Sequence, residues 1–242
     1  SIKAGSYVRQ VSASELLKYI LNVIIENGTP YMLFKDACNR KSNQKNLGTI
    51  KSSNLCTEII QFSSAEEISV CNLSSNSLTS FITSIKPNPN KLTNKYIEGF
   101  ETNLGKIIGK SDQSDLKYID WNLFEIIIRR QVRNLNKLID ISFYPVPEAR
   151  VSNKKHRPMA LGTQDWANLL TLLRLRFNSA GSFELNFYLY EFMYFIACDE
   201  SCNLAMEYRQ EKIHKYQSLG TKISTAQLDK LTYYTKVTDS GA

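Results

Sequence analysis

The 242-residue sequence has few of the features that mark fibrous, linker-rich or membrane proteins. Its 10 glycines and 6 prolines are too few for a collagen-like chain. Its most apolar stretch, residues 187–198, is interrupted by Glu191 and is too short to cross a bilayer. The sequence starts with neither an initiator Met nor an apolar signal core, so we expect a cytoplasmic chain that is an interior piece of a longer protein.

Cysteine and histidine are also scarce. The five cysteines are an odd number in a chain without a signal segment, so we expect reduced thiols and no disulfide framework. Only two histidines are present and no two cysteines are spaced as Cys-x-x-Cys. We therefore expect no metal site.

The sequence has no long run of basic residues, although basic residues outnumber acidic ones. The net charge of +7 and the pI of about 9.1 permit an anionic partner. The basic residues are dispersed in short groups, the longest of which is residues 154–157, and none reads as a nucleic-acid-binding tail. Nucleic acid is therefore not the expected partner, and a basic nucleic-acid-binding domain is kept as an alternative.

Hydrophobic periodicity predicts an α/β fold. Apolar residues recur at helical spacing in four segments, residues 12–27, 120–141, 166–175 and 183–209. Short apolar or β-branched runs predict strands at 31–34, 57–62, 68–73 and 159–162. Residues 74–118 are rich in Ser, Asn, Lys and Pro and are interpreted as a surface insertion, and the last 25 or so residues are polar.

The stretch Asn54-Leu55-Cys56-Thr57-Glu58 carries the best candidate for chemistry. In an extended backbone, Asn54, Cys56 and Glu58 would share one face, each about 6.5 Å from the next. A sulfur-centred oxidant, a carboxylate base and an orienting amide suit chemistry on a polyol. The alternative is a buried cysteine that acts as a small hydrophobe between two polar residues.

The wider sequence resembles the large catalytic subunit of ribonucleotide reductase, of the class I type found in eukaryotes and their viruses. The resemblance rests on residues 28–44, 46–50, 53–59, 70–73, 133–137, 144–149 and 152–158. It covers residues 1–205 apart from the insertion, and it implies a ten-stranded α/β barrel in which a finger loop carries a cysteine to the centre. Residues 1–205 would be the central part of the catalytic barrel, with 74–118 as a variable surface insertion and 206–242 as a weakly matching polar tail.

The resemblance also implies roles for individual residues. Cys56 corresponds to the thiyl-radical cysteine that abstracts the 3′ hydrogen of a ribonucleoside diphosphate. Glu58 corresponds to the base for the 3′ hydroxyl, and Asn54 to the amide that binds the ribose. Cys71 corresponds to one cysteine of the redox-active disulfide, whose partner is not in this chain. Tyr233 and Tyr234 faintly resemble the adjacent tyrosines of the radical relay.

Partners and cofactors are implied in the same way. The implied metal-radical cofactor belongs to the small subunit and none belongs to this chain, while the ATP and deoxynucleotide effectors would bind outside it. A large-subunit oligomer, and thioredoxin or glutaredoxin as reductant, are implied as well. A non-enzymatic remnant of the subunit that acts as an interaction or regulatory protein is the main alternative.

Some features depart from the family or have no assigned chemistry. Ala160 and Asp165 occupy positions where the family usually has glycine, which permits a positive φ or close packing. Cys198 and Cys202 lie four residues apart on a predicted helix and are expected to pack in the hydrophobic core. Residues 154–157 are expected in a solvated loop. Cys56 is expected on an irregular loop that enters an interior cavity, with Cys71 on a strand beside it.

Overall fold

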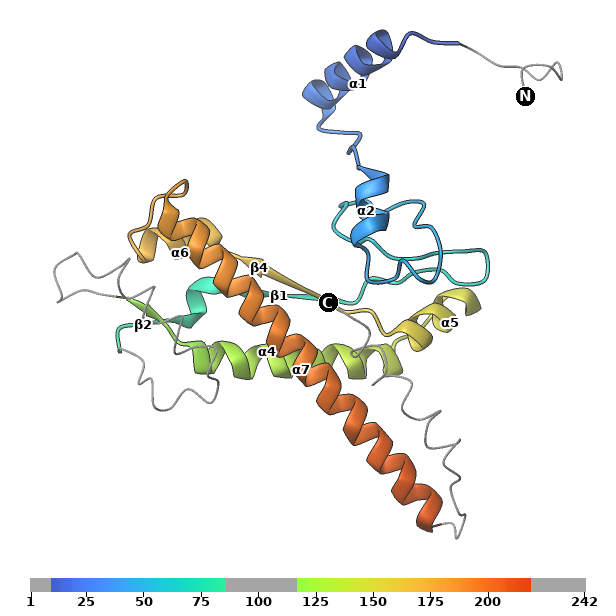
Figure 1. Ribbon diagram of the computed structural model, residues 1–242, viewed down its shortest axis with the longest axis vertical. Coiled ribbons are helices and arrows are strands. Elements are labelled where there is room, and N and C mark those ends of the chain that lie inside the picture. The colour runs from blue at the N-terminus through green and yellow to red at the C-terminus, as the bar shows by residue number, and fades with distance from the viewer. Residues whose placement is uncertain (1–9, 86–116, 219–242) are drawn as a thin grey trace. The chain divides into compact units, whose positions relative to one another are not determined.

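The computed structural model describes residues 10–85 and 117–218 (Figure 1). The chain divides into two compact units, residues 1–70 with 145–153 and residues 71–144 with 154–242. Within the described ranges, no helix combines the length and the apolar character that a membrane span requires.

The first unit contains two helices and, through residues 147–153, most of a third helix that is described below. α1 (Ala13–Asn27) follows Ser12 and ends at Gly28, whose φ of 74° gives the left-handed cap that glycine adopts without strain. Its bounds confirm the predicted helix at 12–27. α2 (Lys35–Lys41) occupies part of the polar segment that follows.

The rest of the first unit is irregular, and the strands predicted at 31–34 and 57–62 are absent from the described structure. Tyr31 and Phe34 are exposed rather than buried. Side chains take the hydrogen bonds that a neighbouring strand would otherwise provide. The Asn39 amide donates to Ile50 O at 3.0 Å and accepts from Ile50 N at 2.7 Å, and Gln44 Oε1 accepts from Phe62 N at 2.7 Å.

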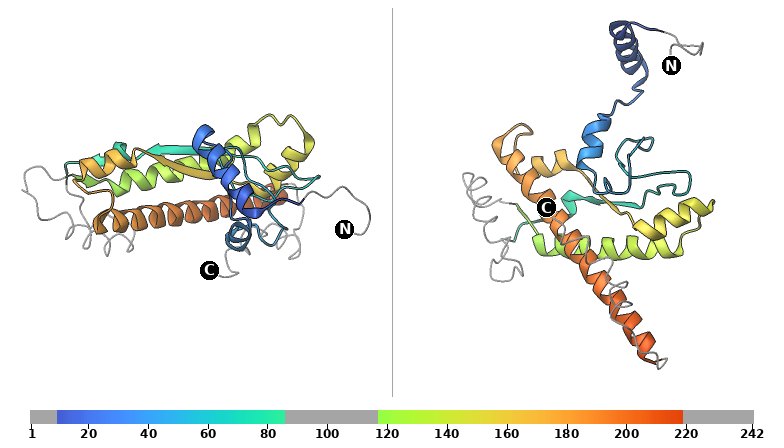
Figure 2. Two further views of the ribbon diagram at one scale, coloured as in Figure 1. Left: turned by 90° about the horizontal axis from the view of Figure 1, so that it is seen from above. Right: turned by 45° about the vertical axis from the view of Figure 1, so that its right-hand side comes forward.

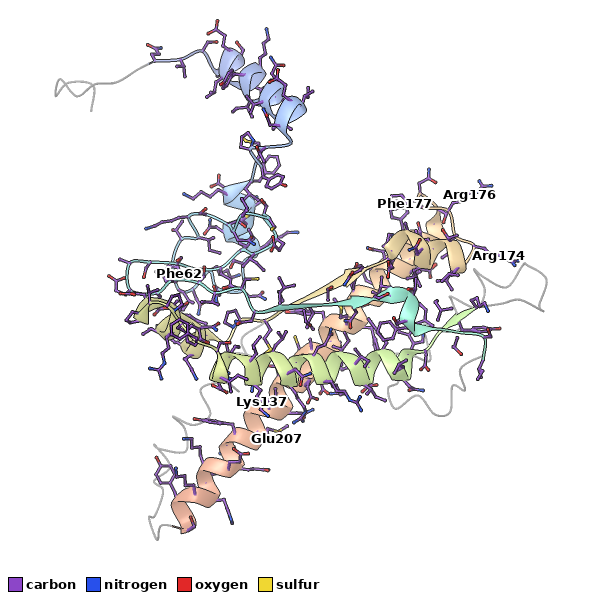
Figure 3. The ribbon with its side chains drawn as sticks, turned by 180° about the vertical axis from the view of Figure 1, so that it is seen from behind. Phe62, Lys137, Arg174, Arg176, Phe177 and Glu207 are labelled. Carbon is purple, nitrogen blue, oxygen red and sulfur yellow. The ribbon has the colours of Figure 1, made fainter. Side chains whose placement is uncertain are left out.

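Gly48 lies directly against Phe62, which is labelled in Figure 3. A Cβ atom on Gly48 would lie 2.6 Å from the Phe62 ring, and the φ of Gly48 is 152°. Only glycine fits this close approach without displacing the ring.

The second unit is built on a parallel pair of strands. β1 (Leu73–Ser77) pairs with β4 (Ala160–Gln164), with Leu73 opposite Ala160 and Ser77 opposite Gln164. The predicted strand at 159–162 is confirmed, whereas the strand predicted at 68–73 begins only at Leu73. β2 (Ile82–Thr83) and β3 (Tyr118–Ile119) form a short antiparallel pair.

Two helices and a turn connect β3 to β4. α4 (Trp121–Ile141) is capped by Asp120, whose side chain accepts from Leu123 N at 2.9 Å. α5 (Pro147–His156) follows and includes residues 154–156, which were expected in a loop. After β4 come α6 (Trp166–Leu172) and the long α7 (Ala180–Ser218). The helices predicted at 120–141, 166–175 and 183–209 are thus confirmed.

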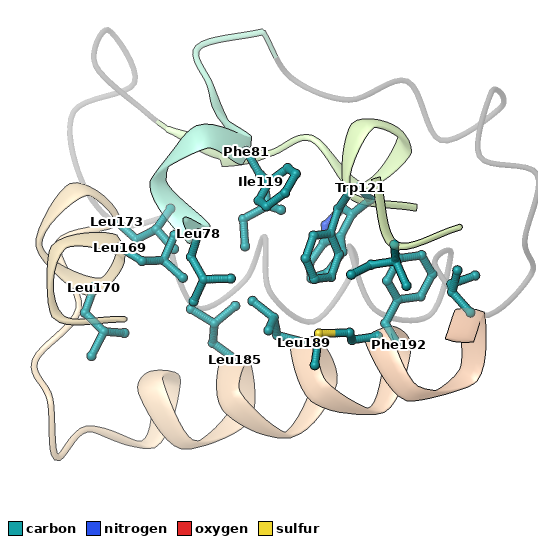
Figure 4. Packing of buried hydrophobic residues seen from close by; sticks show 14 residues of the cluster. Leu78, Phe81, Ile119, Trp121, Leu169, Leu170, Leu173, Leu185, Leu189 and Phe192 are labelled. Atoms are coloured by element: carbon teal, nitrogen blue, oxygen red, sulfur yellow. The ribbon is translucent and has the colours of Figure 1, made fainter. Parts of the chain in front are cut away.

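The core of the second unit lies along α4 and α7. Figure 2 shows α7 crossing α4, and Thr163 of β4 also forms a hydrogen bond of 2.7 Å with Tyr190 of α7. Phe124 contacts Phe81 edge to face, with ring centroids 4.8 Å apart, and Trp121 contacts Phe192 at 5.4 Å. Figure 4 shows the cluster, which also includes Leu78, Ile119, Leu169, Leu185 and Leu189.

Residues 78–81 form a 3-10 helix, η2 (Leu78–Phe81), whose Leu78 and Phe81 are buried in this core. They belong to the stretch that was interpreted as a surface insertion. Residues 74–85 are therefore part of the fold, because β1 and η2 supply both a ladder strand and core side chains. Residues 86–116 lie outside the described part of the chain.

The fold class is mixed α/β. Residues 10–85 and 117–218 contain two two-stranded sheets, and no closed barrel is formed within these ranges.

Candidate functional site

The candidate site in the first unit is a tight loop around Cys56. The amide of Thr57 donates to Asn54 O at 3.1 Å, which closes a turn over residues 54–57. Thr57 has a φ of 70°, in the left-handed region. The backbone is therefore not extended here, and the predicted alternation of side chains on one face does not occur.

Asn54 and Glu58 nevertheless come together. Asn54 Nδ2 donates to Glu58 Oε1 at 2.6 Å, and Asn54 Oδ1 accepts from Ile59 N at 3.1 Å. The amide thus holds the carboxylate on one side and the backbone on the other. The extended backbone predicted from the sequence would have kept Asn54 and Glu58 on one face without contact, whereas the turn brings them into a direct hydrogen bond.

Cys56 lies between these two residues along the chain and is exposed. Leu55, beside it at the tip of the loop, is 87% exposed. The loop is irregular, as expected, whereas the cysteine was expected in an interior cavity. The proposed chemical roles of Asn54, Cys56 and Glu58 stay predictions.

The residues that hold this loop were not singled out from the sequence. Asn39 and Gln44 bind the segments before and after it, and Ser53 Oγ donates to Ile59 O at 2.6 Å. The sequence does contain a signal for them. Amide and hydroxyl side chains recur from residue 39 to residue 53, and such side chains often form hydrogen bonds with the backbone of irregular segments.

Cys71 is exposed and lies two residues before β1, in the second unit. The next residue, Asn72, is buried and anchors the start of the strand. Its Nδ2 donates to Pro158 O at 2.8 Å, and its carbonyl accepts from Ala160 N at 2.8 Å. The distance between the sulfur atoms of Cys71 and Cys56 stays a prediction.

The remaining cysteine predictions are only partly matched. Cys198 was expected in the core but is exposed, and Cys202 is half-buried. Burial raises the pKa of the Cys202 thiol, and the neighbouring Cys198 and Asp199 raise it further. Tyr233 and Tyr234 lie outside the described residues.

Lys154 and Arg157, in the last turn of α5 and directly after it, form ion pairs instead of lying in a solvated loop. Arg157 donates to both oxygens of Asp140, at 3.0 and 2.8 Å, and to Asn136 Oδ1 at 2.7 Å. Lys154 Nζ lies 3.1 Å from Asp140 Oδ1. These hydrogen bonds engage most N–H groups of Arg157 within the protein. The same groups border a cavity of about 410 Å³ between α4 and α7.

Metal binding has no support from the described residues. Among residues 10–85 and 117–218, no three His, Cys, Asp or Glu side chains are grouped so that they could hold an ion. The arrangement around Cys56 offers instead a thiol, a carboxylate and an amide within one short loop.

The chain resembles known proteins over most of its length. The family model of the ribonucleotide reductase barrel domain matches residues 2–239. The large subunit of ribonucleoside-diphosphate reductase from Danio rerio is 41% identical over 204 residues, which are 84% of this chain and 22% of the relative.

Two further relatives match equally well. The corresponding large chain of Schizosaccharomyces pombe is 42% identical over 81% of this chain and 20% of its own length, and the Vaccinia virus large subunit is 42% identical over 82% and 22%. The chain thus spans about a fifth of the length of these relatives. From the extent of the family match and the level of identity, the chain belongs to the ribonucleotide reductase barrel-domain family.

Proposed function

We propose that the chain is the radical-bearing part of a ribonucleoside-diphosphate reductase large subunit, which reduces ribonucleoside diphosphates to deoxyribonucleotides. The observation that carries the proposal is the hydrogen bond of 2.6 Å between Asn54 and Glu58, the residues that flank Cys56, in a chain of this family. A carboxylate held by an amide next to a thiol is what proton and hydrogen-atom removal from one sugar would require.

The proposed roles divide the reaction among three side chains. Cys56, as a thiyl radical, abstracts the 3′ hydrogen atom of the ribose. Glu58 accepts the proton of the 3′ hydroxyl, and the second N–H of Asn54 donates to a ribose hydroxyl. Cys71 and a second cysteine then form a disulfide, and the two electrons and two protons that they give up replace the 2′ hydroxyl by hydrogen as it leaves as water. Cys56 returns its hydrogen atom to the 3′ carbon, and Glu58 returns its proton to the 3′ oxygen.

The complete site requires more polypeptide than the described ranges contain. In the proposal, β1 and β4 are neighbouring strands of a ten-stranded α/β barrel, and residues 53–59 form its finger loop. The small subunit supplies the oxidising equivalent from its metal-radical cofactor. Thioredoxin or glutaredoxin reduces the disulfide, and ATP or deoxynucleotides regulate the oligomeric large subunit.

The test is deoxynucleotide formation from labelled cytidine diphosphate. The large subunit that carries this sequence is combined with its small subunit and a dithiol reductant, and the Cys56→Ala variant is the control. Turnover that disappears in Cys56→Ala supports the proposal. Turnover that survives in Cys56→Ala contradicts it.

The alternative is a non-enzymatic relative that binds or regulates another protein. It predicts that the assembled complex forms no deoxynucleotide, with or without Cys56. The same assay therefore separates the two functions.

A further inference from the structure

Residues 53–59 form the Cys56 loop, and Ser53 closes its neck, the place where residues 53 and 54 meet Ile59. The Ser53 hydroxyl donates to Ile59 O at 2.6 Å and lies 3.3 Å from Asn54 Oδ1. Because a hydroxyl has one proton, the shorter contact is the principal hydrogen bond. Ser53 is half-buried, whereas Cys56 at the tip is exposed.

The neck consists of two hydrogen bonds that run in opposite directions. The Ser53 hydroxyl donates to the carbonyl of Ile59, and the amide of Ile59 donates to Asn54 Oδ1 at 3.1 Å. Both polar groups of the Ile59 backbone are therefore held by two consecutive side chains. This pair of bonds resembles one rung of an antiparallel ladder in which side chains replace one strand.

The neck controls the spacing of the groups at the tip. Glu58 directly precedes Ile59, and its carboxylate accepts from the same Asn54 amide that binds Ile59. If the Ser53 bond is lost, Ile59 can move away from residues 53 and 54, and Glu58 moves with it. Loss of the bond would therefore disturb the position of the carboxylate relative to the amide and to Cys56.

We propose that Ser53 is a positioning residue for the reaction, which keeps Glu58 and Asn54 in register on either side of Cys56. The inference rests on the proposed function. It assigns no contact with substrate to Ser53. The effect of Ser53 is expected on the chemical step rather than on substrate binding, because displacements of about 1 Å at a reacting group can cost about a hundredfold in rate.

The test compares three variants in the complete reductase, with labelled cytidine diphosphate as substrate. Ser53→Ala should lower kcat at least about tenfold, because the displaced Glu58 carboxylate is misaligned in the chemical step, with KM changed less than twofold. Ser53→Thr keeps the hydroxyl and should recover most of kcat. Ser52→Ala is the matched control, because the exposed Ser52 hydroxyl donates only to the neighbouring Ser53 O, at 3.1 Å.

Amide hydrogen exchange on the chain itself gives a readout independent of turnover. In Ser53→Ala, the Ile59 amide should exchange faster while the Ile50 amide, held by Asn39 at 2.7 Å, is unchanged. Equal acceleration at both amides would show general unfolding of the unit and would overturn the inference.

The failure of this inference is distinguishable from failure of the proposed function. Full activity of Ser53→Ala, in an enzyme that Cys56→Ala inactivates, overturns the positioning role alone. A reduced kcat in Ser53→Ala that Ser53→Thr does not recover overturns it as well.

Discussion

At the scale of single residues, Asp165 shows how a side chain can occupy a left-handed position at which the family resemblance led us to expect glycine. Its φ is 67°, in the left-handed region, just before α6. Its carboxylate accepts hydrogen bonds from Ser77 at the end of β1 and, at 3.4 Å, from Thr79. These bonds link the ends of the two paired strands and offset the cost of the backbone conformation.

The two effects can be separated by substitution. Asp165→Ala loses the hydrogen bonds but keeps a Cβ in the left-handed region, so the free energy of unfolding should fall by about 2 kcal/mol. Asp165→Gly loses the same bonds but adopts the conformation without strain and should lose less. Urea unfolding of both variants measures the difference, and a glycine variant less stable than the alanine variant would contradict this account.

Asp140 should make stability depend on acidic pH. Hydrogen bonds from Arg157, and then from Lys154, hold the pKa of this carboxyl below its ordinary value. An ionised form that is favoured in the folded state stabilises the protein above the unfolded pKa of about 4, and this contribution is lost as pH falls through the lower folded pKa.

The expected result is that Asp140→Asn removes part of the decrease in unfolding free energy below pH 4. Arg157→Gln removes the principal cause of the pKa shift and should have a similar effect. The double variant should show no further change in pH dependence. Denaturant titrations between pH 2 and 7 would measure these slopes, and unchanged slopes in all three variants would refute the assignment.

At the scale of helices and strands, a buried carboxylate joins α4 to α7. Glu200 of α7 has only 3% of its side chain exposed and lies between Arg129 and Arg133 of α4. Arg129 Nη1 lies 2.9 Å from one oxygen of Glu200, and Arg133 Nε contacts the other. Acidic neighbours, through hydrogen bonds, raise the pKa of both guanidinium groups, although burial opposes the shift.

Removal of the Glu200 charge should weaken this junction. Glu200→Gln should lower the free energy of unfolding by about 2 kcal/mol, because charged hydrogen bonds in a buried position are lost. Glu207→Gln is the matched control, since Glu207, labelled in Figure 3, pairs with the same Arg133 from an exposed position. A Glu207→Gln effect as large as that of Glu200→Gln would contradict the role of burial.

Helices were more predictable than strands for a physical reason. In α4, apolar residues recur at helical spacing over 21 residues, and a helix forms its backbone hydrogen bonds between residues close in sequence. The apolar runs at 31–34 and 57–62 have strand composition, but strand pairing depends on distant residues that composition does not specify. Here the backbone at Ile50, Ile59 and Phe62 binds the side chains of Asn39, Ser53 and Gln44 instead.

α5 was missed although its sequence contains the usual signals. Pro147 stands at the first helical position, Glu148 lies in the first turn, and Lys154, Lys155 and His156 lie in the last. The polar composition of the segment concealed them, because only Ala149, Ser152 and Asn153 are buried in this helix. Terminal signals therefore identify a helix here that hydrophobic periodicity does not.

At the scale of the whole molecule, the chain should not catalyse the reaction by itself. Cys56 is exposed, and a sulfur radical in contact with water and solutes would be lost to side reactions. The chain also spans about a fifth of the length of its relatives. We expect no deoxynucleotide formation by the 242-residue chain even with small subunit, reductant and substrate supplied.

The measurement is the labelled cytidine diphosphate assay described above, performed on the chain alone and after addition of the remaining large-subunit segments. Turnover only after that addition supports the expectation. Turnover by the chain alone that is abolished in Cys56→Ala would contradict it.

The family was predictable from the sequence, the roles of the candidate site residues stay predictions, and the geometry of the loop was not predicted. The three residue types at 54, 56 and 58 suggested chemistry on a polyol, and the surrounding motifs resembled one family, to which the chain belongs. The turn at 54–57 and the positive φ of Thr57 were not predicted, because the alternation argument assumed an extended backbone. Local side-chain hydrogen bonds decided the conformation.

The hydrogen bonds that close the Cys56 loop all join atoms within residues 53–59. The bonds from Asn39 to Ile50 and from Gln44 to Phe62 hold only the segments on either side, so the loop can be moved as a unit if its new surroundings hold its two ends. Grafted between the ends of two nearby segments in an unrelated host protein, it would present a thiol next to an amide-bound carboxylate. Residues 53–59 therefore form a compact template for protein engineering, in which the host must replace the anchors that Asn39 and Gln44 provide here.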